Sequence, residues 1–177
     1  MADYPLQYES SLLLKDGSQL KLRPIRKEDV QAWLAFVSRL GAHTKYLRFH
    51  HVVKTMDMED ALRFCTVDYK DTFALVAEIP RQGYLDIIAV VRYNRIPKSH
   101  VAEFALVVED AYHGKGIGTK LMENLARAAC DNGITTFEGD ILAENNEMMA
   151  VLKDYGFKVA VELEAGVYHV KFPITER

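Results

Sequence analysis

The residues with the clearest chemical meaning are three glycines at every second position. Gly114, Gly116 and Gly118 stand in the string H-G-K-G-I-G-T, between an apolar run and an amphipathic run. Because glycine has no Cβ, the backbone N–H groups of such a loop can point into a shared hollow. That hollow lies where a helix is predicted to begin, with unpaired N–H groups and a positive dipole. The loop therefore predicts an anion site, most often for phosphate.

The spacing of this loop excludes the two commonest phosphate motifs. A P-loop requires the string G-x-x-x-x-G-K-[ST], which does not occur in the sequence. A dinucleotide-binding loop, G-x-G-x-x-G, requires its third glycine at the position that Thr119 occupies. Taken alone, the loop leaves a second interpretation open, namely a glycine-rich strand-to-helix turn without any ligand.

Glu103 is the second residue with chemical meaning. It is the one acidic residue inside the apolar run 101–108, ten residues before His113. A carboxylate can accept a proton, but its ordinary pKa near ~4.3 makes it a weak base unless burial or a water helps. The alternative is a strand residue that faces solvent or forms a salt bridge.

The surrounding pattern predicts the elements that position these residues. Strands are predicted at residues 19–24, 72–79, 84–95, 101–108, 134–142, 158–164 and 167–172. Helices are predicted at 26–40, 42–51, 58–65, 117–131 and 147–154, with Gly41 after the first helix and a four-residue hairpin loop at 80–83. The strand–helix–strand unit around the glycine loop requires one parallel pair. The predicted fold class is therefore α+β, with a mixed, mostly antiparallel sheet.

Length and composition narrow the class of protein. The 177 residues are predicted to form an N-terminal tail with a short strand (1–17) and a single domain (18–177). The net charge of −3 argues against nucleic acid, and no apolar run approaches the ~20 residues of a membrane span. We expect a cytoplasmic protein, because the N-terminus lacks signal-peptide features. The two cysteines are predicted to be free thiols, and the histidine spacing predicts no metal site.

Two stretches of the sequence resemble the GNAT superfamily of N-acetyltransferases. His113-x-x-Gly116-x-Gly118 is similar to the [QR]-x-x-G-x-[GA] loop that binds the pyrophosphate of coenzyme A in that superfamily, with histidine in place of Gln or Arg. Asn145 followed by Gly156 and the next phenylalanine resembles the N-(x)10-G-F signature. The resemblance covers about residues 18–172 and implies a GNAT-like sheet, flanked by helices, with a βαβ core that binds acetyl-CoA.

Within the superfamily, the strings Y-L-R-F (46–49) and A-E-F-A (102–105) resemble the acetyltransferase domain of bacterial Pat-type protein lysine acetyltransferases. This resemblance implies transfer of an acetyl group from acetyl-CoA to a primary amine, with Glu103 as general base and no metal. The residues implied to bind the cosubstrate are Leu106, Val107, Val108, His113, Gly114, Lys115, Gly116, Ile117, Gly118, Thr119 and Asn145. The fused sensor domains of some Pat-type enzymes are not expected in this chain, so we expect any such regulation to be absent or supplied in trans.

Several alternatives remain open from the sequence. Asn145 either binds the cofactor arm or only caps the following helix. Leu152 stands where many GNAT enzymes carry a tyrosine as general acid, and Tyr155 is interpreted as a packing residue. The acceptor is a protein lysine or a small amine, and a non-catalytic acyl-CoA-binding protein is the third hypothesis. The oligomeric state is not given by the sequence, and a homodimer is one possibility.

Overall fold

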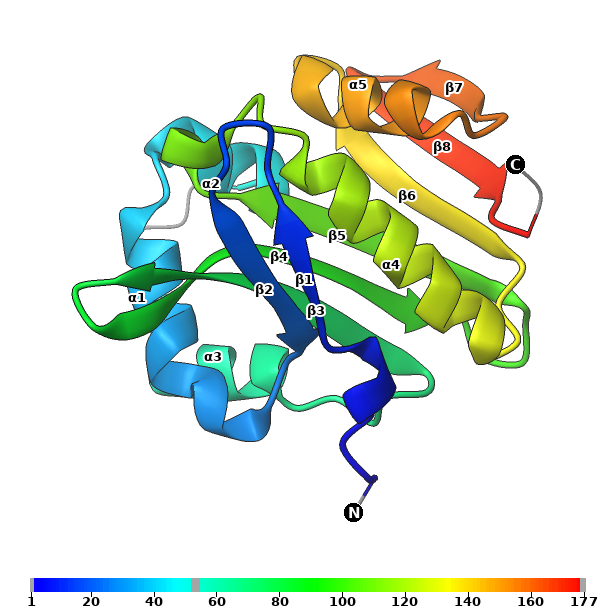
Figure 1. The fold of residues 1–177 in the computed structure, drawn as a ribbon. Coiled ribbons are helices and arrows are strands. Elements are labelled where there is room, and N and C mark those ends of the chain that lie inside the picture. Colours follow the sequence, from blue (N-terminus) through cyan, green and yellow to red (C-terminus); the bar gives the residue numbers. More distant parts are fainter. Residues whose placement is uncertain (1, 52–54, 176–177) are drawn as a thin grey trace.

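The computed structural model describes residues 2–51 and 55–175, which form one eight-stranded sheet with helices on both faces (Figure 1). The strand order is β1-β2-β3-β4-β5-β6-β8-β7, and only β5 and β6 pair in parallel. The strands are β1 (Ser10–Leu13), β2 (Gln19–Pro24), β3 (Thr72–Arg81), β4 (Tyr84–Arg95), β5 (Val101–Val108), β6 (Thr136–Leu142), β7 (Ala160–Glu164) and β8 (Val167–Pro173). The predicted mixed, mostly antiparallel fold is confirmed.

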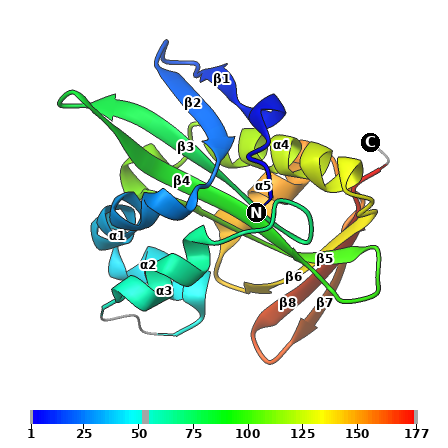
Figure 2. The ribbon, with the colours of Figure 1, turned by 90° about the horizontal axis from the view of Figure 1, so that it is seen from below.

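Helices cover the two faces of the sheet. One face carries the first three helices and the other face the last two (Figure 2), with a buried apolar cluster in each layer. The helices are α1 (Val30–Arg39), α2 (Ala42–Phe49), α3 (Met58–Cys65), α4 (Ile117–Asp131) and α5 (Asn146–Tyr155), with short 3₁₀ turns η1 (Leu6–Tyr8), η2 (Lys27–Asp29) and η3 (Asp110–Tyr112). No helix within residues 2–51 and 55–175 is long and apolar enough to cross a membrane.

Helix α4 forms because its apolar residues recur on one side. Ile117, Leu121 and Leu125 are at most 1% exposed in the core against β3 and β4. Burying one leucine side chain contributes about 1.5–3 kcal/mol, so this face holds the helix and the glycine loop before it in place. The helix ends at Asp131, and Gly133 follows with a φ of +77°.

The strands β5 and β6 pair over only a short stretch. β5 is paired with β4 up to Val108, but it is paired with β6 only as far as Glu103, which lies opposite Glu138. Beyond that pair the two strands diverge (Figure 1). The edge of residues 104–108 that faces β6 therefore has no strand partner among the described residues, and its N–H and C=O groups, apart from the Val108 carbonyl, are available to a ligand.

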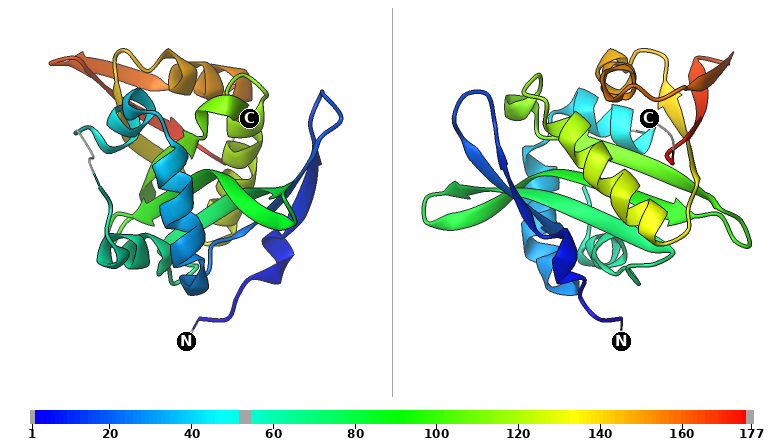
Figure 3. Two further views of the ribbon diagram at one scale, coloured as in Figure 1. Left: turned by 90° about the vertical axis from the view of Figure 1, so that its left-hand side faces the viewer. Right: turned by 45° about the vertical axis from the view of Figure 1, so that its right-hand side comes forward.

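The N-terminal segment joins the sheet. The strand expected there exists as β1, which pairs with β2 across the Asp16-Gly17 turn, and Tyr8 is buried in the core. The hairpin of β1 and β2 forms one end of the sheet, and the hairpin of β7 and β8 forms the other (Figure 3).

One local prediction was wrong. The hairpin loop at 80–83 contains only Gln82 and Gly83, whose φ values of +49° and +84° match the two-residue turn that suits twisted strands. Pro80 belongs to β3 beyond its last pair with β2, on an edge where its missing N–H costs nothing. Gly41 follows α1 as predicted, with a φ of −62°, and it is also the residue before α2. A Cβ there would lie 2.8 Å from Asp110 Oδ2, so this close contact favours glycine.

Candidate active site

The glycine loop leads into α4 without a side-chain cap. Gly114 and Gly116 have φ values of +72° and +79°, which glycine adopts at little cost. Gly116 is the residue before the helix, and no side chain accepts a hydrogen bond from the first-turn N–H groups. Gly118 has another role, because a Cβ there would lie 3.0 Å from Val151 and 3.1 Å from Leu106. The missing side chain of Gly118 lets α4 approach α5 and β5 closely. The uncapped N–H groups at the start of α4 lie at this junction.

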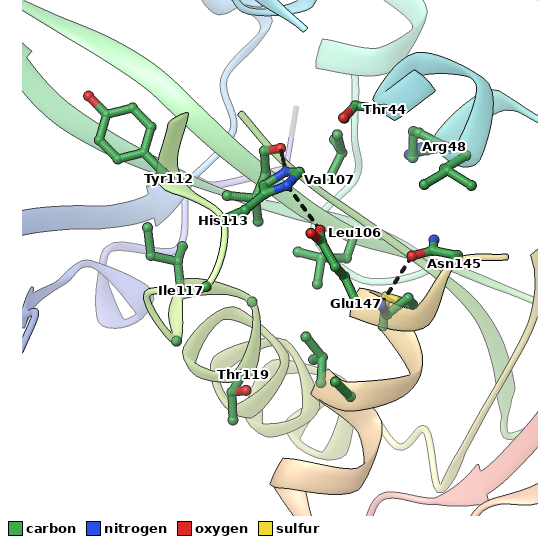
Figure 4. Close-up of a pocket in the computed structure, with 18 of the residues that line it drawn as sticks. Thr44, Arg48, Leu106, Val107, Tyr112, His113, Ile117, Thr119, Asn145 and Glu147 are labelled. Carbon is green, nitrogen blue, oxygen red and sulfur yellow. Dashed lines mark hydrogen bonds and ion pairs between the residues drawn. The ribbon is translucent and has the colours of Figure 1, made fainter. Parts of the chain in front are cut away.

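A pocket of about 280 Å³ lies between this loop, β5, α2 and α5 (Figure 4), and we call it the cofactor pocket. It is lined by Thr44, Leu47, Arg48, Leu106, Val107, Val108, Tyr112, His113, Gly114, Gly116, Ile117, Gly118, Thr119, Asn145, Glu147, Met148, Ala150, Val151 and Asp154. Every predicted cofactor residue except Lys115 is among them. Lys115 is exposed, and its Nζ lies 3.2 Å from Asp16 Oδ2 of the β1–β2 turn.

His113 joins two walls of the cofactor pocket. Its Nε2 lies 2.7 Å from the Val108 carbonyl oxygen, and its Nδ1 lies 3.0 Å from Glu147 Oε2 of α5 (Figure 4). Both ring nitrogens are therefore engaged within the protein. The arrangement places an imidazole ring that bridges β5 and α5 where the related motif has Gln or Arg. The Val108 carbonyl is already occupied by this bond.

Asn145 combines the two roles that the sequence left open. Its Oδ1 accepts the N–H of Met148 and so caps α5, while the residue also lines the cofactor pocket (Figure 4). Its Nδ2 makes no hydrogen bond within the described parts of the chain and is available to donate to a ligand. Capping and ligand binding are therefore compatible.

The end of α5 contains no general acid in the pocket. Leu152 is 1% exposed and belongs to the core. Tyr155 packs on Phe157 with ring centroids 3.7 Å apart, in agreement with its interpretation as a packing residue. Neither residue lines the cofactor pocket.

Glu103 lies near the start of β5, at the last pair before β5 and β6 diverge, whereas the glycine loop follows the end of that strand. Its side chain is exposed and makes no hydrogen bond or ion pair with the described residues, whereas the adjacent Glu138 has Lys171 Nζ at 3.6 Å. The carboxylate is therefore open to solvent and to a bridging water.

Two wide cavities meet at Glu103. The first, which we call the acidic cavity, has about 930 Å³ and is lined by Arg48, Phe49, His50, Glu103, Phe104, Ala105, Glu138, Gly139, Asp140, Ala160, Val161, Glu162, His169, Val170 and Lys171. The second, the arginine cavity, has about 580 Å³ and is lined by Arg48, Phe49, His51, Thr55, Met56, Asp60, Arg63, Phe64, Arg92, Asn94, Glu103, Phe104 and Ala105. The two share Glu103 and its neighbours Phe104 and Ala105, together with Arg48 and Phe49.

Arg48 connects these cavities to the cofactor pocket, and the sequence analysis did not include it among the site residues. It lines the cofactor pocket, both cavities and a narrow channel of about 40 Å³ that passes Leu106 and Asn145 where β5 and β6 part. Arg48 stands in the string Y-L-R-F (46–49) that resembles Pat-type enzymes, but no local spacing rule relates this string to Glu103. Only the packing of α2 against β5 brings the two together.

The position of α2, and with it Arg48, depends on Asp110 after β5. Its carboxylate accepts hydrogen bonds from the Gly41 N–H at 3.0 Å and from the Thr44 hydroxyl at 2.9 Å. Partial burial alone would raise the pKa of Asp110, but these hydrogen bonds outweigh it and the pKa lies below its usual value. The ionised carboxylate therefore anchors the start of α2.

The pocket, the uncapped helix and the unpaired strand edge define a protein that binds an extended ligand with a phosphate group at one end. Comparison with known proteins identifies the ligand class. The family model described as an acetyltransferase (GNAT) domain matches residues 19–158. The chain belongs to the GNAT acetyltransferase family, and it is an acetyl-CoA-dependent N-acetyltransferase.

Individual relatives agree with this family. The acetyltransferase PA5475 of Pseudomonas aeruginosa is 28% identical over 81% of this chain and 77% of its own. The acetyltransferase Pat of Mycolicibacterium smegmatis is 32% identical over 81% of this chain, which spans only 42% of that protein. The crystal structure of the GNAT domain of S. lividans PAT has a TM-score of 0.87 at 31% identity, covering 97% of this chain and 99% of that one.

The residues of the pocket are suited to acetyl-CoA. The uncapped N–H groups of α4 can hold the pyrophosphate beside His113, and the unpaired edge of β5 can hold the pantetheine arm. The structure of yncA from Salmonella typhimurium, which was determined with its cofactor acetyl-CoA, has the same fold. Its TM-score is 0.66 at 18% identity, over 89% of this chain and 95% of that one. Among the residues that the structure describes, no group of three or more His, Cys, Asp and Glu could hold a metal ion.

Proposed function

We propose that the acceptor is the side-chain amine of a lysine in a protein, and that Glu103 receives its proton. The observation that carries this proposal is the open acceptor side, where cavities of about 930 and 580 Å³ meet at Glu103. A small-amine enzyme would need a narrow enclosed cup to hold its substrate. A broad surface with one reactive carboxylate instead suits a lysine presented on a folded partner.

The chemistry requires loss of a proton. A lysine ammonium has a pKa near ~10.4 and no free lone pair at neutral pH. Glu103, exposed and without an ion-pair partner among the described residues, is free to accept that proton directly or through one water. When bound, acetyl-CoA supplies an activated thioester carbonyl. The unpaired N–H groups of β5 are placed to hydrogen-bond the oxygen of that carbonyl as it gains charge.

Electrostatics favour a cationic acceptor on one side of Glu103. The acidic cavity carries four carboxylates, from Glu103, Glu138, Asp140 and Glu162, of which two are ion-paired with Lys171 and His169. Together with the resemblance to Pat-type enzymes, this charge supports a lysine acceptor. A small polyamine is the second candidate, because the same four carboxylates would also attract a polycation.

The experiment compares acceptors for the purified protein with acetyl-CoA. Mass spectrometry would detect acetyl-lysine on the proteins of a cell lysate, and release of CoA thiol would be measured with a panel of polyamines and amino acids. We expect acetylation of specific protein lysines at a rate that exceeds that of every small amine. Activity only with small amines would contradict the lysine assignment, and acetyl-CoA binding without any turnover would identify a non-catalytic binding protein.

Two matched variants control this experiment. Glu103→Gln removes the proposed base, and Glu138→Gln makes the same chemical change one strand away, on a carboxylate held by Lys171. Acetylation that survives Glu103→Gln at the wild-type level is non-enzymatic or uses another base. We expect Glu103→Gln to lose far more activity than Glu138→Gln.

A further inference from the structure

The arginine cavity holds two guanidinium groups without a carboxylate partner among the described residues. Arg92 is 7% exposed and donates one hydrogen bond, from Nη1 to the Phe64 carbonyl oxygen at 3.2 Å. Arg48 is half-buried and makes no hydrogen bond or ion pair within residues 2–51 and 55–175. Arg63, the third arginine of the cavity, is ion-paired with Asp60. A buried charge without a counterion is unfavourable, so the pair calls for an explanation.

Aromatic rings hold the two guanidinium groups in place. The Arg48 guanidinium carbon lies 5.0 Å from the Phe49 ring centroid, and that of Arg92 lies 5.1 Å from the Phe64 ring centroid. The two rings pack edge to face at 6.0 Å, and Trp33 stacks on Phe64 at 5.0 Å. Such rings attract a cation over their faces. They also fix two like charges close together, which an anion between them would stabilise.

This arrangement lowers the pKa of both arginine side chains. Burial, and next the charge of Arg92, lower the pKa of Arg48 to about 10. Burial also lowers the pKa of Arg92. Both groups remain charged at neutral pH, so each is a cation in surroundings that penalise the charge.

The anions already present in the cavity do not neutralise the pair. Asp60 is engaged with Arg63, and Glu103 forms no ion pair with either arginine. The two sides of Glu103 thus have opposite character, with carboxylates in the acidic cavity and unpaired guanidinium groups in the arginine cavity. An ammonium suits the first side, and an anion suits the second.

We propose that the arginine cavity binds a carboxylate between Arg48 and Arg92. The inference rests on the acetyl transfer proposed above, because it places this carboxylate beside the reacting groups. It has two possible sources. A dicarboxylic acyl chain can carry it, since Arg48 also lines the cofactor pocket and the channel. An acidic residue beside the acceptor lysine can carry it instead, since the cavity opens at Glu103.

Two binding experiments distinguish these sources without requiring turnover. In the donor arm, calorimetry compares succinyl-CoA with 4-methylpentanoyl-CoA, which has the same shape and no charge. In the acceptor arm, fluorescence anisotropy measures the affinity of CoA-loaded protein for labelled Lys-Asp and Lys-Asn peptides. We expect the carboxylate ligand of at least one arm to bind about tenfold tighter than its neutral match, as for a charge-assisted hydrogen bond.

Variants test whether Arg48 and Arg92 cause the tighter binding of the carboxylate ligand over the matched neutral ligand. Arg48→Gln and Arg92→Gln should each reduce the preference to about threefold or less, whereas Arg63→Gln, whose charge is already paired, should keep it. Because Arg48 is only half-buried, its variant tests the site even if the buried Arg92→Gln fails to fold. Equal binding of both members in both arms would overturn the proposal, as would a preference that persists in Arg48→Gln. If the carboxylate binds but no amine is acetylated, the proposed function fails and the binding site stands.

Discussion

The cofactor pocket and the acceptor side of this protein are built in different ways. The pocket uses backbone groups, small residues and one helix N-terminus, most of them within residues 106–119, and α2 and α5 complete its walls. The acceptor side is built from charged side chains of α2, α3 and strands β4 to β8. Recognition by the main chain leaves a local sequence motif, whereas recognition by side chains from distant elements leaves none.

This difference predicts that variants separate into two groups. Changes on the acceptor side should alter turnover and acceptor affinity while acetyl-CoA binding stays intact. Changes around the glycine loop should alter acetyl-CoA binding first.

The largest expected effect is that of Glu103→Gln on turnover. Loss of a general base lowers the rate by about 10²- to 10⁴-fold. The acetyl-CoA dissociation constant should change less than about threefold, because Glu103 does not line the cofactor pocket. Steady-state kinetics and calorimetry on the same preparations would measure both, with Glu138→Gln as the matched control. If the two variants lose activity equally, the acidic cavity acts only through its overall charge.

A second prediction concerns Gly118→Val. Its side chain would collide with Val151 and Leu106, which already lie near 3 Å from an added Cβ. Forcing α4 away from α5 should weaken acetyl-CoA binding by at least about tenfold, and overpacking should cost about 1–3 kcal/mol of stability.

A matched variant separates the binding effect of Gly118→Val from its effect on stability. Leu125→Ala should cost about 2–5 kcal/mol in the core but keep the affinity for acetyl-CoA, since Leu125 does not line the pocket. Calorimetry and thermal unfolding would be recorded for both variants. Unchanged acetyl-CoA binding in Gly118→Val would contradict the role of the close helix contact.

A smaller effect is expected for His113→Ala. It removes the ring that holds Glu147 and so releases a carboxylate that would repel the pyrophosphate. Acetyl-CoA should bind about three- to tenfold more weakly, whereas His113→Gln, which restores the residue usual in the family motif, should lose less. A dissociation constant for His113→Ala equal to that of the wild type would remove His113 from the cofactor site.

The smallest predicted effect is a pH dependence of the affinity for a lysine peptide on the acceptor side. A hydrogen bond to Asp140 raises the pKa of His169, so its positive charge persists to higher pH than usual and is lost as pH rises through the raised pKa. The acidic cavity then becomes more negative, and the affinity for a cationic lysine peptide should increase. Because His169 is exposed, we expect a change of about two- to threefold. Peptide titrations from pH 6 to 9 on wild type and His169→Gln would measure it, and identical profiles would contradict it.

The sequence predicted the fold well, and it predicted residues that the structure brings together around one pocket. Apolar periodicity gave β2, α3 and α4 nearly to the residue, and the glycine loop and Asn145 both line the cofactor pocket. These features are local, so their physical causes lie in neighbouring residues. Prediction was weaker where a distant partner decides the outcome. The conformation of Gly41 could not be predicted from its neighbours, because its N–H and its missing side chain face Asp110, 69 residues away in the sequence.

Charged side chains were the least predictable part. Arg23 lies in β2 beside Leu22, and its side chain is buried and hydrogen-bonded to Asp29 and Glu78 instead of facing solvent. Arg48 and Arg92 come from α2 and β4, and no spacing rule brings them together. Long-range packing decides which charges meet, and one sequence read alone does not contain that information.

The most direct test of the account is a crystal structure with a bisubstrate analogue in which CoA is linked to the side-chain nitrogen of a lysine peptide. The account predicts the pyrophosphate at the N-terminus of α4, the linker between β5 and β6, and the lysine nitrogen within about 3 Å of the Glu103 carboxylate or joined to it by one water. A lysine nitrogen that lies beyond the reach of one bridging water, or pyrophosphate bound away from the glycine loop, would contradict it.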